Sequence, residues 1–375
     1  MIANTDKREK LNGARLKALI DNTAQSIFKD LQELENRREQ VKHRWIWELL
    51  QNARDAARYG SELEICIEVR PDVLVFRHNG KRFSDEEISH LIFHGSSKQN
   101  NGDSESVGHF GSGFISTHLL SKFVDVQGRL EDGSSFSFEL NREANSADEL
   151  KRLMDVSWDG FISSLDGTQD HTFSTQFTYP LSPEATTVVA SGIAALDHCA
   201  AYILAFNRKI HTLQISVDSH CTRFVRRHIN LNDNVTIEEI DVSRDSQKSE
   251  RRSVATINGD NVAVAVMGIP DNHGTRVNLS TDVPRLFLAF PLHDSEDLCF
   301  PSVINSESFG PNEDWGGVYL GTGDTDAVRR NEEILGTACQ LLPKVAEVLL
   351  DCNWSNTASL ALLEGVQHKG WIGGD

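Results

Sequence analysis

Residues 47–56 read Trp-Glu-Leu-Leu-Gln-Asn-Ala-Arg-Asp-Ala, and this stretch decides the fold class. Across residues 14–58, apolar side chains recur at spacings of three and four, which predicts a helix with one core-facing stripe. The stripe is formed by Ile46, Leu49, Leu50, Ala53 and Ala57. Glu48, Asn52 and Asp55 stand at i, i+4 and i+7 and share the opposite face. An amide oxygen can ligate Mg²⁺ while a nearby carboxylate activates water, although such a face is more often simply solvated.

Alternating strands and capped helices are predicted downstream of this helix. Leu63–Val69 and Val73–Arg77 form an antiparallel pair around a Pro71-Asp72 turn, and Ser84 with Glu87 forms a capping box. Residues 94–107 are small and polar, which indicates a loop. Further elements follow: helix 113–121, strands 123–127 and 135–140, helix 147–155, strand 175–179 and helix 184–206.

A glycine run, Val-Gly-His-Phe-Gly-Ser-Gly-Phe at 107–114, opens the helix at 113. Gly108, Gly111 and Gly113 would let a phosphate approach the backbone, and the free N–H groups of a helix start favour an anion. A dinucleotide fingerprint is excluded, because the run follows a polar loop and no βαβ unit frames it. The run alone is weak, but its order after the helix and the strand pair is hard to obtain by chance.

This order of motifs resembles the GHKL superfamily of gyrase-type topoisomerases, ninety-kilodalton heat-shock chaperones, histidine kinases and mismatch-repair ATPases. The helix at 47–56 looks like its N box and the glycine run like its G2 box. The resemblance implies that Glu48 is the general base, Asn52 the Mg²⁺ ligand and Asp55 a polar residue facing the pocket. It assigns a further set to the nucleotide: Gly108, His109, Phe110, Gly111, Ser112, Gly113 and Phe114, with Ser96, Ser97 and Lys98 where the ATP lid begins. Lys98 would reach a β- or γ-phosphate or remain an exposed loop lysine.

The adenine-binding motif of the family, DxGxG, is altered in this chain. His78-Asn79-Gly80 stands in its place, with His78 at the aspartate position and Arg82 at the second glycine. A neutral imidazole nitrogen or the Asn79 oxygen could accept the hydrogen bond from the base, or His78 could simply cap the strand end. For the family's Gly-Thr element, Thr175 at a strand start is favoured over Gly167-Thr168 in the preceding loop.

The phrases WELLQNARDA and HNGKRFSDEEI are most similar to sacsin-like and bacterial chaperone-related ATP-binding proteins, and the strong resemblance covers roughly residues 40–206. A chain of 375 residues exceeds one comfortable core, which predicts two domains. We expect an α+β chain with a Bergerat-type α/β sandwich at 1–206. A transducer-like α/β domain is expected at 207–375, with strands over 210–279 and a long helix over 326–352.

Charge and composition limit the partners. The net charge of −18 disfavours nucleic acid, although Arg223, Arg226 and Arg227 form a local basic group that could also be a solvated strand edge. The six cysteines have no CxxC spacing, so zinc and disulfides are not expected and buried free thiols are. With no signal-type segment and no apolar run near the roughly 20 residues that span a bilayer, a cytoplasmic protein without a membrane partner is predicted.

The function that the resemblance implies is Mg²⁺-dependent binding and slow hydrolysis of ATP. Lid closure would drive homodimerisation or a change in a further domain or partner protein, in a chaperone-like or defence-type assembly. Arg329 and Arg330 are weak candidates for a cation that enters the site. The alternative is a scaffold that binds ATP without hydrolysing it. A histidine kinase is disfavoured because it needs a dimerisation helix pair that carries a phosphoacceptor histidine before the ATP domain. His43 instead immediately precedes the N box.

Overall fold

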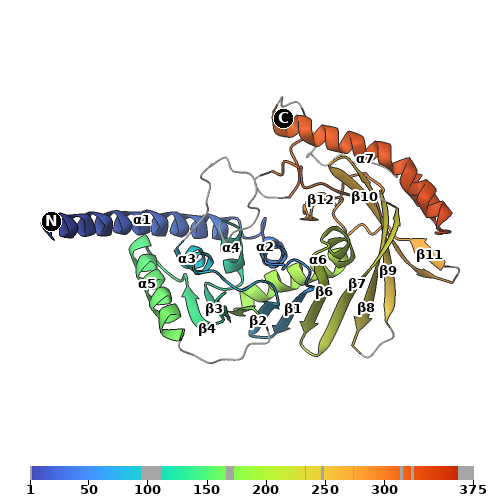
Figure 1. Cartoon of the computed structure of the whole chain (residues 1–375). Coiled ribbons are helices and arrows are strands. Elements are labelled where there is room, and N and C mark those ends of the chain that lie inside the picture. Colours follow the sequence, from blue (N-terminus) through green and yellow to red (C-terminus); the bar gives the residue numbers. More distant parts are fainter. Residues whose placement is uncertain are drawn as a thin grey trace. The chain divides into compact units, whose positions relative to one another are not determined.

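The computed structural model describes residues 2–93, 112–165, 173–232, 234–245, 249–272, 274–312, 316–321 and 325–361. The chain is α+β and forms two compact units, Met1–Gly192 and Ile193–Asp375. The division falls inside helix α6 (Pro183–Phe206), whereas the boundary expected from the sequence lies at the end of that helix. Each unit is described by itself (Figure 1).

Unit 1 contains five antiparallel strands in the order β1, β2, β5, β3, β4. Their bounds are Leu63–Arg70, Val73–His78, Thr175–Pro180, Phe123–Arg129 and Ser135–Asn141. Directly opposed residues build one buried row across all five strands: Ile67, Phe76, Phe177, Val126 and Phe138. The reverse face is polar, with a Gln176–Gln127 hydrogen bond of 3.1 Å. This alternation is that of a sheet covered on one side only.

The helix predicted over 14–58 is two helices, α1 (Ile2–Asn36) and α2 (Arg44–Asp55). That prediction was wrong because residues 37–43 contain neither Gly nor Pro, so the pattern gave no sign of a break. The chain turns there through short-range bonds such as Arg44 N–H to the Val41 carbonyl, 2.9 Å. Burial of Val41 and Trp45 accompanies the turn, which indicates that tertiary packing overrides helix propensity at this point.

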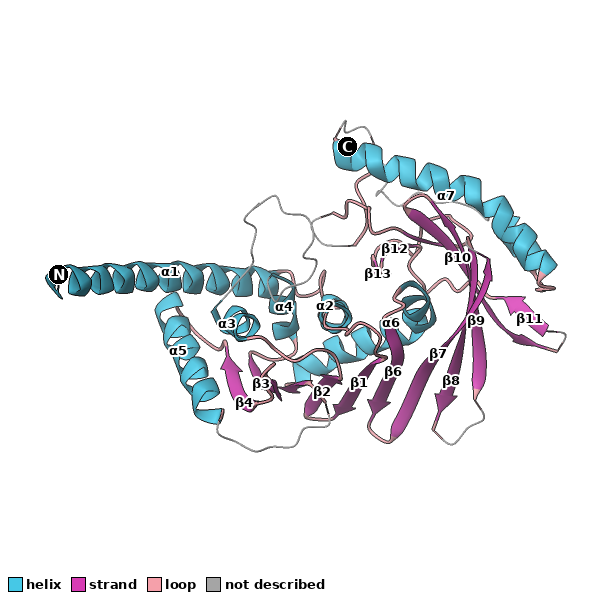
Figure 2. Cartoon of the chain, viewed as in Figure 1, coloured by secondary structure: helices cyan, strands magenta, loops and turns pink. Residues whose placement is uncertain are grey.

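The remaining helices of unit 1 follow the predicted order (Figure 2). The capping box of α3 (Asp85–Phe93) is confirmed: Ser84 Oγ accepts from Glu87 N–H at 3.2 Å, and Glu87 Oε2 accepts from Ser84 N–H at 3.0 Å. α4 (Ser112–Ile115) continues into a 3₁₀ turn, η1 (Ser116–Leu119). α5 (Ala147–Ser164) is longer than predicted. Figure 1 shows α2, α3 and α4 on the same side of the unit 1 strands.

Unit 2 is built on successive antiparallel strands β6 to β10: Ile210–Val217, His220–Asn232, Val235–Arg244, Glu250–Gly259 and Val262–Asp271. Two short strands, β11 (Gly274–Val277) and β14 (Val303–Asn305), pair with β10. A third, β12 (Leu286–Leu288), pairs in parallel with β14 and antiparallel with β13 (Phe290–Pro291). Helix α7 (Asp326–Asp351) packs on β9 and β10 through its buried stripe, and η2 (Thr357–Ala361) follows it. The predicted strand-rich region and long helix are therefore confirmed.

Helix α6 corrects one expectation about membrane segments. Its 24 residues are long and apolar enough to cross a bilayer by length and composition, although no such run was expected from the sequence. Most of the helix is nevertheless buried inside the protein, with Leu196, Ala200 and Leu204 inaccessible to solvent. Burial of this kind is typical of a core helix.

The packing of α2 on α6 provides a test of the fold. Trp45 is fully buried and donates its Nε1–H to the Val188 carbonyl, 3.3 Å, and a Cβ on Gly192 would lie 2.6 Å from the Trp45 ring. We expect Gly192→Ala to lower the free energy of unfolding by about 1–3 kcal/mol through overpacking. Urea denaturation followed by tryptophan fluorescence measures this change.

Gly160→Ala is the matched control in the same unit. Gly160 is an exposed glycine of α5, and its added Cβ would meet only Phe138 Cβ at 3.8 Å. The control should be neutral or stabilising by up to about 1 kcal/mol, because alanine is the better helix former. Equal effects of the two substitutions would contradict the proposed packing of Trp45 on Gly192.

Candidate functional site

The polar face of α2 is enclosed. The Glu48 side chain is 15% exposed and that of Asp55 16%, so neither belongs to an openly solvated surface. Arg44, one turn before Glu48, places its Nε 3.3 Å from Glu48 Oε1. Burial raises the pKa of Glu48, and the Arg44 charge and hydrogen bond only partly oppose that rise. A carboxyl group with a raised pKa is suited to take up a proton near neutral pH.

The predicted N box and the end of the glycine run lie in contact. A Cβ on Gly113, in α4, would overlap Glu48 Oε2, so only glycine permits this approach. Phe114, the next residue, packs its ring 5.2 Å from that of Phe177 in β5. Two segments more than sixty residues apart in sequence thus meet over one face of the sheet.

Asn52 lies between Glu48 and Asp55 on the same helix face. Its Nδ2 is buried and makes no hydrogen bond with the residues that the structure describes. A buried amide in this state carries a desolvation cost that a polar ligand would relieve. Because the two ends of an amide are interchangeable by rotation, the group can present either N–H to a phosphate oxygen or Oδ1 to a cation.

Glu48 and Asn52 together offer a hard-oxygen donor set. Mg²⁺ commonly takes one or two protein oxygens and completes its shell with phosphates and water. A carboxylate and an amide one helical turn apart fit that requirement, and Asn52 is the better candidate ligand because Arg44 already pairs with Glu48. Among the described residues, no group of three or more His, Cys, Asp or Glu side chains could hold a metal by itself.

The opposite end of the site is a pair of strand ends. His78, the last residue of β2, lies directly across from Thr175, the first residue of β5. Both are buried, with exposures of 3% and 1%. They belong to the sheet face that carries Phe76 and Phe177, because side chains two residues apart on a strand share a face. Register therefore brings together two residues that were predicted separately from the sequence.

A tight turn after β2 joins this end to the end of α2. Lys81 N–H donates to the Ala56 carbonyl at 2.5 Å, and a Cβ on Gly80 would lie 2.6 Å from that same oxygen. Asn79 secures the start of β1. Its Oδ1 accepts from Glu64 N–H at 2.8 Å and its Nδ2 donates to the Glu62 carbonyl at 3.2 Å. The Asn79 oxygen, one of the two acceptors considered from sequence, is therefore in use.

Several predicted site residues lie outside the described part of the chain. These are Ser96, Ser97, Lys98, Gly108, His109, Phe110 and Gly111, together with the alternative Gly167-Thr168. For Ser112 only the backbone, at the start of α4, is described. The described half of the candidate site consists of Glu48, Asn52, Asp55, His78, Asn79, Gly80, Gly113, Phe114 and Thr175.

Sequence reasoning missed three basic side chains near these elements, of which Arg142 and His118 are buried and Arg44 is partly buried. Arg44 could have been found from its i, i+4 spacing to Glu48. Arg142 donates to the Leu91 and Ile92 carbonyls, at 3.1 and 2.7 Å, and so caps the end of α3; burial lowers its pKa to about 10. His118 contacts the Ser121 carbonyl at 3.1 Å, and burial lowers its pKa to about 3. The last two depend on long-range packing, which no local pattern reports.

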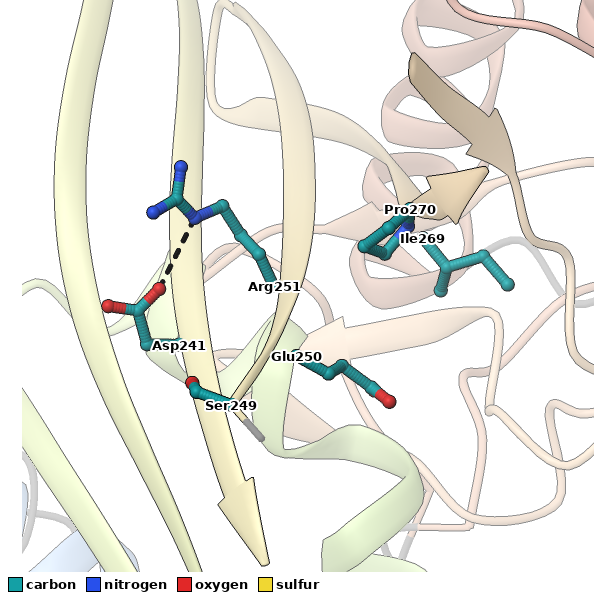
Figure 3. Close-up of a pocket in the computed structure, with 6 residues that line it drawn as sticks. All are labelled: Asp241, Ser249, Glu250, Arg251, Ile269 and Pro270. Carbon is teal, nitrogen blue, oxygen red and sulfur yellow. Dashed lines mark hydrogen bonds and ion pairs between the residues drawn. The ribbon is translucent and has the colours of Figure 1, made fainter. Parts of the chain in front are cut away.

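Unit 2 contains an open pocket of about 720 Å³ that the sequence did not predict. Figure 3 shows its lining residues, with Arg251 Nε 3.3 Å from Asp241 Oδ1. Arg227 pairs with the same carboxylate, and Arg251 also reaches Glu239 at 3.1 Å, so both guanidinium groups lie beside acids. For Arg227, one of the three arginines of the basic group seen in the sequence, this pairing favours the solvated-strand interpretation.

The remaining candidates from the sequence are two arginines of α7 and the cysteines. Arg329 pairs with Asp326 at 2.5 Å on the exposed side of α7, and Arg330 is exposed beside it. The six cysteines are free thiols, but only Cys199 is buried and Cys299 and Cys339 are exposed, so the expectation of buried thiols was wrong for most of them. Neither position falls on an apolar stripe long enough for the sequence to decide its burial.

No protein-family model matches the chain, and no curated protein is similar enough in sequence to match it.

The buried state of His78 predicts a pH dependence. Burial lowers its pKa to about 4 from the ordinary 6.5, so the unfolded chain binds the proton more readily than the folded one. Stability from this group is complete above pH 6.5 and is lost as the pH falls to about 4, by about 3 kcal/mol in total. His78→Asn should flatten the fall in unfolding free energy across this window.

Urea denaturation at a series of pH values from 7.5 to about 4.5 measures both profiles. The difference in unfolding free energy between wild type and variant above pH 7, where imidazole and amide are both uncharged, isolates the effect of the changed packing. Parallel profiles for wild type and variant down to the lowest pH would show that His78 is not buried in its neutral form.

Proposed function

We propose that unit 1 is a Bergerat-type nucleotide-binding module of the GHKL kind that binds a Mg²⁺-nucleoside triphosphate and hydrolyses it slowly. The triphosphate that the resemblance implies is ATP. One observation carries the proposal: the fold assembles the predicted motifs in pairs. Glu48 meets Gly113, and His78 faces Thr175, although these four residues come from four separate segments.

The phosphate end is supported by the chemistry of α2. Asn52 would hold Mg²⁺ through its amide oxygen, and the bound ion would neutralise charge on the phosphate oxygens. Glu48 would accept the proton of the attacking water on a carboxylate oxygen. Its raised pKa brings that carboxylate closer to the strength of base that operates near neutral pH. Arg44 would orient the carboxylate and keep it from protonating permanently.

The conformational change that would follow nucleotide binding is proposed from the resemblance alone. In that interpretation nucleotide binding closes a lid and changes the association of the chain with a second copy, or with a further domain or partner protein. A chaperone-like or defence-type assembly in the cytoplasm would use such a change. Unit 2 would be the transducer-like domain.

A second candidate is a scaffold that binds nucleotide but does not hydrolyse it. It is favoured by the Arg44–Glu48 ion pair, because a carboxylate already paired with a guanidinium is a weaker base. The substitution of histidine for the family's aspartate points in the same direction.

Phosphate release separates the two candidates. Wild type should release inorganic phosphate from Mg·ATP slowly, and Glu48→Gln should reduce the rate by at least about a hundredfold while nucleotide still binds, because removal of a general base costs on the order of 10²–10⁴. Glu64→Gln, a change of an exposed glutamate on β1, is the matched control and should leave the rate unchanged. Background rates for wild type together with nucleotide binding would support the scaffold, and no nucleotide binding would remove the proposal.

The proposed Mg²⁺ ligand has a separate test. Asn52→Ala should weaken ATP binding by about tenfold in the presence of Mg²⁺ and by less in EDTA, because only the metal-bound form uses the amide oxygen. Isothermal titration with and without Mg²⁺ measures both affinities. Gln51→Ala, at the adjoining position of α2, is the control. An equal loss under both conditions would assign Asn52 a purely structural role.

A further inference from the structure

The ring of His78 is fixed in one tautomer by the turn that follows it. Gly80 N–H donates a hydrogen bond to His78 Nδ1 at 3.1 Å. A backbone N–H can only donate, so Nδ1 is the unprotonated nitrogen and a neutral ring carries its proton on Nε2. The ring is neutral at physiological pH because burial lowers its pKa to about 4. Within the described residues, Nδ1 is the only ring atom of His78 with a hydrogen bond.

Hydrogen bonds around the turn therefore occupy two acceptor atoms and leave one donor, Nε2–H of His78. Asn79 Oδ1, the other acceptor at this strand end, is bonded to Glu64 N–H. At this end of the strand pair, the buried face carries Nε2–H of His78 and the hydroxyl of Thr175 opposite it, with Tyr179 further along β5 on the same face. A hydroxyl can donate or accept, whereas Nε2–H can only donate. The His78 ring is thus complementary to a group that accepts.

We propose that a nucleobase at the His78–Thr175 end is recognised through an acceptor atom on its edge, to which His78 Nε2 donates, and that an exocyclic amine contributes nothing to its binding. This inference rests on the proposed function. Purines carry two suitable acceptors: N1 of adenine and the carbonyl oxygen of a 6-oxopurine. An amine aimed at Nε2–H would place two donors against each other in a buried site, which loses the hydrogen bond and leaves both unpaired.

Three nucleotides test the proposal on the wild-type chain. Isothermal titration compares the Mg²⁺ complexes of ATP, of purine riboside triphosphate, which lacks the 6-amino group, and of inosine triphosphate, which has a 6-carbonyl. Removal of the amine should change the affinity by less than about threefold, since no hydrogen bond is lost. Weakening by about tenfold or more would overturn the proposal. Inosine triphosphate identifies the acceptor: tighter binding than ATP indicates the carbonyl oxygen, and weaker binding indicates N1.

A matched pair of variants isolates the role of the ring. Asparagine and aspartate have the same shape, and each can accept Gly80 N–H through a side-chain oxygen, as in an Asx turn. His78→Asn keeps a donor and should retain the wild-type indifference to the amine. His78→Asp offers only acceptors and should prefer ATP over purine riboside triphosphate by about tenfold. Identical preferences in the two variants would overturn the proposal.

The controls separate failure of this inference from failure of the proposed function. Thr175→Val removes a hydroxyl that is able to donate or accept, so it should weaken all three nucleotides alike. Binding that depends on the amine in wild type overturns the inference while nucleotide binding stands. Absence of binding by all three nucleotides overturns the proposed function itself. The wild-type comparison decides the matter even where a variant does not fold.

Discussion

The hydrogen bond from Lys81 to the Ala56 carbonyl, at the end of α2, is the constraint on which unit 1 depends. It attaches the turn after β2 to the helix that carries Glu48 and Asn52, and the missing side chain of Gly80 lets the two backbones approach. Strand pairing then fixes β5 against β2, so the position of His78 also determines the position of Thr175. One close contact between backbones thereby sets the separation between the two ends of the candidate site.

The enclosed polar face of α2 has an energetic cost that the helix must offset. Burying a carboxylate is unfavourable unless a partner or ligand compensates it, and Arg44 gives Glu48 only partial compensation. Trp45, Leu49 and Leu50 on the rest of the helix are fully buried and contribute the opposing hydrophobic term. A helix with a broad buried apolar face can therefore carry a few poorly solvated polar groups. Such groups concentrate at functional sites.

Much of this fold could be predicted from the sequence, because its elements have strong local signals. The β1–β2 hairpin, the capping box of Ser84 and the order of the later strands follow from alternation and turn chemistry. The break before Arg44 could not be predicted, because it depends on burial of Val41 in the folded chain. For the site, the motifs gave Glu48, His78 and Thr175, and only the register showed that the last two are opposed. The capping role of Arg142 is a tertiary fact, since it requires atoms that the fold brings together, whereas the tautomer of His78 depends on the geometry of a local turn that no sequence pattern reports.

Because side chains alternate between the two faces of β2 and β5, the site depends on the pairing register of these strands. His78 and Thr175 share the buried face only because the two strands pair as they do, and a slip of one residue would turn one of them towards the polar face. Such a mispaired chain could keep its helices and much of its secondary structure while losing the opposition of the two side chains. The direct opposition of His78 and Thr175 therefore distinguishes a correctly paired molecule from a compact but misregistered one.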